Sequence, residues 1–176
     1  MSKLAAACAA VILAGVASQA SAAEYQALTD FRTYCVANQA DPAAISAAAQ
    51  KAGWTLGKAD DRGTELTRTD GGQQRALYLS EDVLDGVRIR GCLAGLMPGS
   101  AEVSTSVQDF MGRDPTYTNG GYAMWNFVDR DGKRTFLSSQ EAVEASKRGE
   151  TLVTIATGLR GPLATVIYTE VSKVGK

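Results

Sequence analysis

Hydrophobic residues recur at helical spacing in two stretches near the start of the chain. Between residues 25 and 38, Leu28, Phe31 and Cys35 fall on one face. From 42 to 52 the apolar positions recur at i, i+3, i+4 and i+7, and all but the first are alanine. An aspartate and a proline precede this second stretch and a glycine follows it, which are start and stop signals of a helix. We therefore predict two consecutive helices, the second with a face that a partner can approach closely.

The hydrophobic period changes to two after residue 63, and turn signals of the Asp-Gly type separate the alternating stretches. In the stretch 87–93 the apolar side chains occupy odd positions, whereas Arg88, Arg90 and Cys92 occupy even ones. The pattern predicts that Cys92 lies on the same face as the two arginines. We expect strands at seven stretches: 65–69, 73–80, 87–93, 122–129, 133–137, 151–157 and 163–171.

Two more helices are expected between these strands. A stripe of apolar residues runs from 100 to 111, and Ser138 with Glu141 forms a capping box at the start of a helix to about Arg148. Most strands follow one another through tight turns. The sequence therefore predicts a single α+β domain over residues 23–176, with a largely antiparallel sheet of about six to seven strands and three to four helices packed on one face.

Residues 1–22 have the arrangement of a secretory signal peptide. Lys3 precedes an apolar run of 13 residues, and the small residues Ala20-Ser21-Ala22 follow. A helix that spans a membrane needs about 20 apolar residues, so this run is too short for an anchor. We expect cleavage after Ala22, no membrane span afterwards, and a mature chain that is periplasmic or secreted.

Cleavage would remove Cys8 and leave Cys35 and Cys92 as the cysteines of the mature chain. An even number of cysteines in an exported chain indicates a disulfide, because the compartment is oxidising. We therefore predict a Cys35–Cys92 bridge, which would close a long loop and reinforce the core.

Charge and composition exclude several classes of chemistry. The 176 residues include 18 Lys+Arg, 19 Asp+Glu and no histidine, and the formal net charge is −1. A chain so close to neutral is not suited to bind nucleic acid through its overall charge. Without histidine there is no Ser-His-Asp triad, no Cys-His pair and no histidine-ligated zinc. Glycine-rich nucleotide motifs are missing as well, so we expect neither a cofactor nor a metal site.

Clustered carboxylates are the remaining candidates for catalysis, since a hydrolase can work with two acids facing each other across a cleft. All of the clusters lie in predicted turns, where aspartate forms the turn itself. The clusters are Asp60-Asp61, Glu81-Asp82 with Asp85, and Asp129 with Asp131. We therefore name no catalytic residue, and a histidine-free carboxylate hydrolase stays an alternative.

The loop from 112 to 122 combines the residue types that anchor binding surfaces. It carries Arg113, Tyr117, Asn119 and Tyr122. Tyrosine supplies a large, rigid contact area, and arginine supplies several hydrogen-bond donors in one plane. We predict that these four residues bind a ligand or partner. The alternative is a plain connecting loop, in which a proline and paired glycines only turn the chain.

The layout resembles that of small exported bacterial proteins from families without an assigned activity. The shared parts are a signal peptide, an early helix with one cysteine, an Asp-Pro helix that ends in Gly-Trp, and a later strand with the second cysteine. The resemblance implies a periplasmic location and no particular activity.

These observations favour a periplasmic binding or interaction module, such as an envelope adaptor or a small protein inhibitor, over an enzyme. Its partner would be an envelope protein or a small molecule, and the sequence does not indicate an oligomeric state. A carrier that holds a small apolar ligand between sheet and helices is a further alternative. The alanine-rich helix and Met97, Met111 and Met124 are the residues that favour a carrier.

Overall fold

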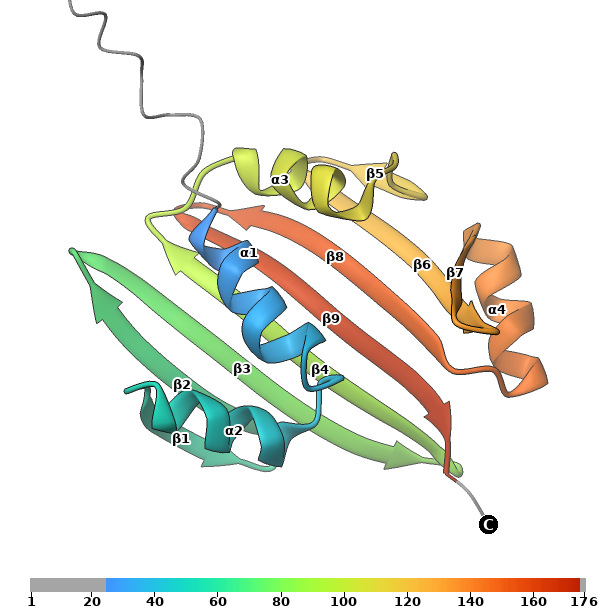
Figure 1. The fold of residues 1–176 in the computed structure, drawn as a ribbon, viewed down its shortest axis with the longest axis horizontal. Helices are drawn as coiled ribbons and strands as arrows, with labels where there is room; N and C mark the ends of the chain where they lie inside the picture. Colours follow the sequence, from blue (N-terminus) through green and yellow to red (C-terminus); the bar gives the residue numbers. More distant parts are fainter. Residues whose placement is uncertain (1–24, 175–176) are drawn as a thin grey trace, which may run out of the picture.

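The computed structural model describes residues 25–174, which form one nine-stranded sheet with helices packed against it (Figure 1). The sheet order is β1-β2-β3-β4-β9-β8-β6-β5, β7 pairs with β6, and each pairing is antiparallel. The strands are β1 (Thr55–Asp60), β2 (Gly63–Asp70), β3 (Gln73–Leu84), β4 (Val87–Met97), β5 (Tyr117–Asn119), β6 (Tyr122–Arg130), β7 (Lys133–Leu137), β8 (Leu152–Arg160) and β9 (Leu163–Lys173). The helices are α1 (Gln26–Asp30), which continues as the π-helical turn η2 (Phe31–Val36), then α2 (Pro42–Lys51), α3 (Glu102–Met111) and α4 (Ser139–Arg148).

This architecture confirms the predicted α+β class and the antiparallel sheet. The two strands that the sequence pattern did not predict are β1 and β5. Every residue of β1 is exposed, and β5 has three exposed residues. Neither strand therefore shows the alternation of buried and exposed side chains by which a strand is recognised. The predicted signal peptide, residues 1–22, lies outside the described residues.

Local signals begin α2 and α4 where the sequence predicts them. The Asp41 carboxylate accepts a hydrogen bond from the backbone N–H of Ala44 at 2.9 Å and caps α2. At α4, Ser138 and Glu141 form the reciprocal hydrogen bonds of a capping box. Within residues 25–174, no helix is both long enough and apolar enough to cross a membrane.

The predicted disulfide is present and joins η2 to β4. The Cα atoms of Cys35 and Cys92 lie 5.5 Å apart, and both residues are buried. As expected from the alternation in β4, Cys92 shares a face with Arg88 and Arg90, and the disulfide shows that this face is the one toward the helices. We call this side of the sheet the helix face, and α1, η2, α2 and α3 all pack on it. Its core includes Trp125 in β6 and Ile155 in β8.

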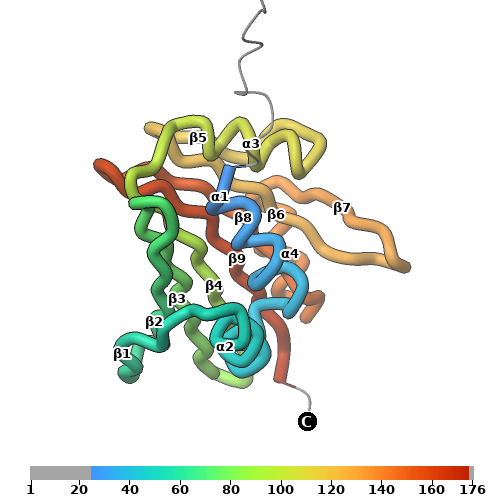
Figure 2. The backbone as a smooth tube through the Cα atoms, turned by 60° about the vertical axis from the view of Figure 1, so that its left-hand side comes forward, coloured from blue at the N-terminus to red at the C-terminus, as the bar shows by residue number. Residues whose placement is uncertain are grey.

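The fourth helix, α4, packs on the opposite side of the sheet, so the prediction that the helices share one face is wrong for this helix. It forms a separate cluster with Val128 and Leu137, and Val128 points away from the side of β6 that carries Trp125 and Phe127. The helix α3 connects β4 to β5, whereas α4 connects β7 to β8 in the reverse direction across the sheet; Figure 2 shows both paths. Both connections join parallel strands, and such crossovers are right-handed, so the two helices lie on opposite faces.

Candidate binding surface

One side of the sheet is largely uncovered. Within residues 25–174, α4 is the only helix that packs on the side opposite the helix face, and it covers only the end of β6 and β8 near Val128 and Leu152. We call the rest of this side the open face. It consists of alternate residues from the five neighbouring strands β3, β4, β9, β8 and β6.

Strand register aligns one apolar side chain from each of these strands across the open face. Each residue lies directly opposite the next in a neighbouring strand, so together they form a continuous band perpendicular to the strands. We call this band the apolar row; its members are Tyr78, Leu93, Ile167, Ala156 and Met124.

Small residues line both sides of the apolar row. The first small row consists of Ala76, Gly95, Thr165 and Gly158, and its position on β6 is occupied by the larger Tyr122. The second small row, which lies toward α4, consists of Ser80, Gly91, Thr169, Thr154 and Asn126. Beyond the first small row, Met97 and Leu163 border a hollow of about 240 Å³ that also reaches Glu65 and Thr67 in β2. On β3, β4 and β9 the open face is therefore ridged, with large and small side chains in alternate rows.

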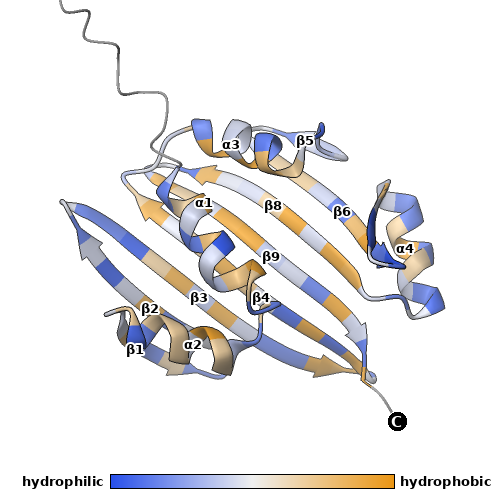
Figure 3. Cartoon of the chain, viewed as in Figure 1, coloured by the Kyte–Doolittle hydropathy of each residue, from blue (hydrophilic) through white to orange (hydrophobic). Residues whose placement is uncertain are grey.

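Charged side chains lie around the open face and not within it. On this side of the five strands, the charged residues are Asp82 near the end of β3 and the strand-end residues Lys173, Arg160 and Arg130. At the border with β2, Glu65 lies directly opposite Tyr78. Figure 3 shows hydrophobic segments concentrated in the central strands β4, β9 and β8, with more hydrophilic segments toward the ends of the strands. An uncharged centre with a charged border is the usual anatomy of a protein interface.

The two sides of β3 differ sharply in exposure. Leu77 and Leu79 on the helix face are 0% and 1% exposed, whereas Tyr78 between them is 37% exposed. On β4, Met97 at the border of the open face is 38% exposed. These large apolar side chains remain accessible because no helix covers them.

The structure brings three of the four predicted binding residues to this surface. In the pairing of β5 with β6, Tyr117 lies opposite Met124, and Asn119 lies opposite Tyr122. Because Met124 and Tyr122 point to the open face, the three predicted residues lie together on this side of the sheet, at the β5 border of the open face. The amide of Asn119 donates to the Tyr117 hydroxyl at 3.3 Å. The two-residue turn between the strands has positive φ at both glycines, which a hairpin turn of this kind requires.

The fourth predicted residue, Arg113, lies on the other side. Its guanidinium stacks on the ring of Phe136 at 4.4 Å, and Phe136 pairs with Phe127 of the helix face. Its backbone carbonyl accepts a hydrogen bond from the indole N–H of Trp125 at 3.1 Å. Arg113 therefore anchors the loop after α3 and is separated from the tyrosines.

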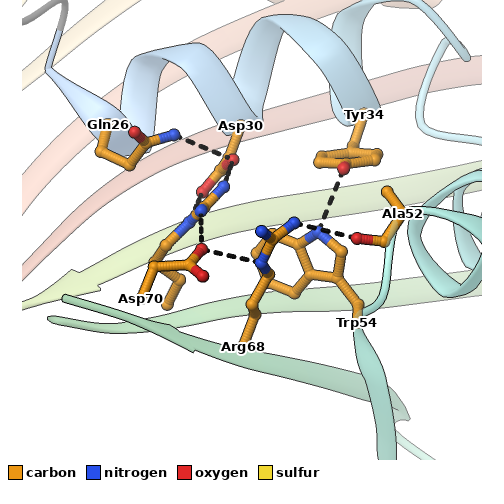
Figure 4. A network of polar contacts seen from close by, with 8 residues as sticks. Gln26, Asp30, Tyr34, Ala52, Trp54, Arg68 and Asp70 are labelled. Carbon is orange, nitrogen blue, oxygen red and sulfur yellow. Dashed lines mark hydrogen bonds and ion pairs between the residues drawn. The ribbon is translucent and has the colours of Figure 1, made fainter. Parts of the chain in front are cut away.

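A buried ion-pair network lies under α1 on the helix face (Figure 4). The Arg75 guanidinium donates to both carboxylate oxygens of Asp30, and it also pairs with Asp70 at 2.5 Å. Hydrogen bonds to Asp30 raise the pKa of Arg75, although burial acts against this shift. The guanidinium also lies 5.1 Å from the ring of Trp54, whose indole N–H donates to Tyr34 at 3.0 Å. The network is closed on itself and holds α1 on β3.

The carboxylate clusters have no arrangement that suits a hydrolase. All seven residues of the clusters singled out in the sequence are exposed. The prediction that every cluster lies in a turn is wrong for Glu81 and Asp82, which lie within β3 because this strand continues to Leu84 in its pairing with β4. Glu81 is paired with Arg88 at 3.1 Å and Arg90 at 3.5 Å. The described residues contain no group of three or more carboxylates or cysteines placed to hold a metal ion.

The residues that favoured an apolar-ligand carrier do not line a shared cavity. Met97 and Met124 lie on the open face, whereas Met111, the last residue of α3, is buried in the core of the helix face. The space between helices and sheet contains the fully buried side chains of Phe31 and Ile45, among others. The open face is thus the feature of the described chain that best suits binding.

Comparison of the chain with protein-family models, with curated proteins and with solved structures gives no match. The fold and the surface by themselves describe an α+β protein with one covered and one open sheet face.

Proposed function

We propose that this chain is a non-catalytic binding module of the periplasm or the secreted fraction, and that it docks a folded protein on its open face. The observation that carries the proposal is the uncharged, partly exposed centre of that face within a charged border. A contiguous apolar patch of more than a few hundred Å² is unusual on a monomer that binds nothing. Both an envelope adaptor and a protein inhibitor would use such a face.

Export is supported by two observations. Residues 1–22 have the order of a signal peptide, and the Cys35–Cys92 disulfide suits an oxidising compartment. Mass spectrometry of the protein from cell envelopes should find an N-terminus at or next to Ala23. A full-length species that keeps Met1 in the cytoplasm would contradict export.

Docking is tested with a photo-reactive residue, p-benzoyl-phenylalanine, placed at Ile167 in the centre of the open face. The matched control is Leu56, an apolar residue that is 49% exposed on β1 and lies on the other side of the sheet. Irradiation of whole cells should join a protein to the chain from position 167 and not from position 56. If neither position 167 nor Leu93 forms a protein adduct, the open face is not a docking surface.

A further inference from the structure

We propose that the occupant of the open face is a second copy of this chain, packed sheet against sheet. The inference rests on the proposed docking function and names the partner. It follows from the alternation of rows. When rows of large and small side chains alternate at a constant spacing, the large rows of one copy can pack into the small rows of a second copy.

The spacing of the rows sets the fit. Neighbouring rows are two residues apart along a strand, which is about 6.7 Å. Consider a two-fold axis that lies between the two copies and runs perpendicular to the strands, midway between the apolar row and the first small row. Rotation about this axis places the apolar row of each copy over the first small row of the other copy. The same rotation places Met97 and Leu163 of each copy over the second small row of the other copy. Large side chains thereby meet small ones in both directions on β3, β4 and β9, as an isologous interface requires. On β6 the apolar side chains of Tyr122 and Met124 meet each other across the interface.

The helix α4 determines which of the possible registers is open. It covers the open side at Val128 and Leu152, so the second copy must pack toward the opposite end of the strands. In the register described above, β6 of the partner begins at Tyr122, one row beyond its apolar row. The partner's β6 therefore ends before it reaches α4, and the partner's β8 ends with Arg160 over Thr154, one row before Leu152.

In this register Tyr78 of each copy meets the hollow of the other. Tyr78 lies in the apolar row on β3, and the axis places it over Ala76 of the partner, which lines the hollow of about 240 Å³. A partly exposed tyrosine facing a hollow is a typical anchor of a protein interface.

The area is sufficient for a specific dimer. Five strands about 4.8 Å apart and seven residues of about 3.3 Å each cover roughly 550 Å² of flat surface in each copy. The pair would bury about 1,100 Å², and a specific interface needs about 1,000 Å². Sheets stacked face to face lie about 10 Å apart, which leaves room for one interdigitated layer of side chains.

The test is the mass of the purified mature chain, with its disulfide, by sedimentation velocity over a range of concentrations. The wild-type protein should have twice the mass of the chain. Ile167→Asp places an unpaired charge in the centre of the interface and should raise the dimer dissociation constant at least about 100-fold. Leu56→Asp, on the other side of the sheet, should leave the dimer unchanged.

Tyr78→Ala provides a second variant at the border of the face, in case Ile167→Asp does not fold. Circular dichroism and the thermal midpoint establish folding for each variant. A monomeric wild-type protein, or a dimer that persists in both folded open-face variants, would overturn the inference.

The failures of the two proposals are distinguishable by photo-crosslinking from position 167. An adduct of two identical chains, in cells and in the purified protein, supports the dimer. An adduct with a different protein keeps the docking function and overturns self-association. No protein adduct overturns both proposals.

Discussion

Asp30 in α1 and Arg75 in β3 form a buried ion pair in which two guanidinium nitrogens meet both carboxylate oxygens. The two residues are 45 positions apart in the sequence, and their side chains are 3% and 10% exposed. Because the pair is closed, neither group is available for chemistry. Its role is to fix the first helix on the helix face.

Breaking this pair should be costly, since it leaves an uncompensated charge in the core. We expect Asp30→Asn to lower the free energy of unfolding by about 3 kcal/mol. The control is Glu144→Gln, which removes the exposed 2.8 Å contact to Lys147 and should cost less than about 1 kcal/mol. Urea denaturation of both variants measures the difference. Equal small losses would mean that the buried pair contributes no more than a surface pair.

The disulfide should contribute stability by restricting the unfolded chain. Its cysteines are 57 positions apart, and a loop of this length corresponds to about 4 kcal/mol in the chain-entropy model. The double variant Cys35→Ala/Cys92→Ala should therefore unfold at a clearly lower urea concentration than the oxidised wild-type protein. Titration of the unfolded mature wild-type chain should detect no free thiol; two reactive thiols would show that the bridge is absent.

Stability should fall in strongly alkaline solution because of Tyr168. Burial raises the pKa of Tyr168 to about 12, and the charge of Glu170 adds to this effect. The folded protein holds the phenol proton more tightly than the unfolded chain, whose tyrosine has a pKa of about 10. The stabilisation is complete below about pH 10 and is lost as the pH rises toward 12, on the order of 2 kcal/mol. Tyr168→Phe should show a flatter decline over this range in unfolding measurements, and an unchanged slope would contradict the assignment.

The separation of Tyr117 from Arg113 gives a prediction that distinguishes the two sides of the loop. Tyr117→Ala should weaken the complex formed on the open face by about 1–3 kcal/mol and leave the thermal midpoint nearly unchanged, because the side chain is exposed. Arg113→Ala should leave binding unchanged and lower stability by about 0.5–1 kcal/mol through loss of its contact with Phe136. The opposite result would place the binding surface on the helix side.

Much of the local structure was predictable because the deciding contacts span only a few residues. The cap of α2 joins Asp41 to a backbone group three residues away, and the capping box of α4 joins Ser138 to Glu141. The hairpin between β2 and β3 needs only the two glycines with positive φ after Asp70. Alternation along β4 correctly placed Cys92 on the same face as Arg88 and Arg90, since successive side chains of a strand point to opposite faces.

The binding surface was only partly predictable, because it depends on pairings between distant strands. Residue type indicated Tyr117, Asn119 and Tyr122, and the hairpin places them together; Arg113 has the same kind of signal but lies on the other side. The apolar row could not be assembled from the sequence, because β9, the last strand, inserts between β4 and β8.

The sequence by itself determined the class of fold, the disulfide and the starts of the helices, because composition, cysteine count and short-range hydrogen bonds suffice for these. Only the tertiary structure decided which side of the sheet stays open. That outcome depends on the right-handed path that carries α4 to the far side and on the register that aligns Leu93 with Ile167. Both are properties of long-range pairing, in which any one strand is compatible with several neighbours until the whole core is packed.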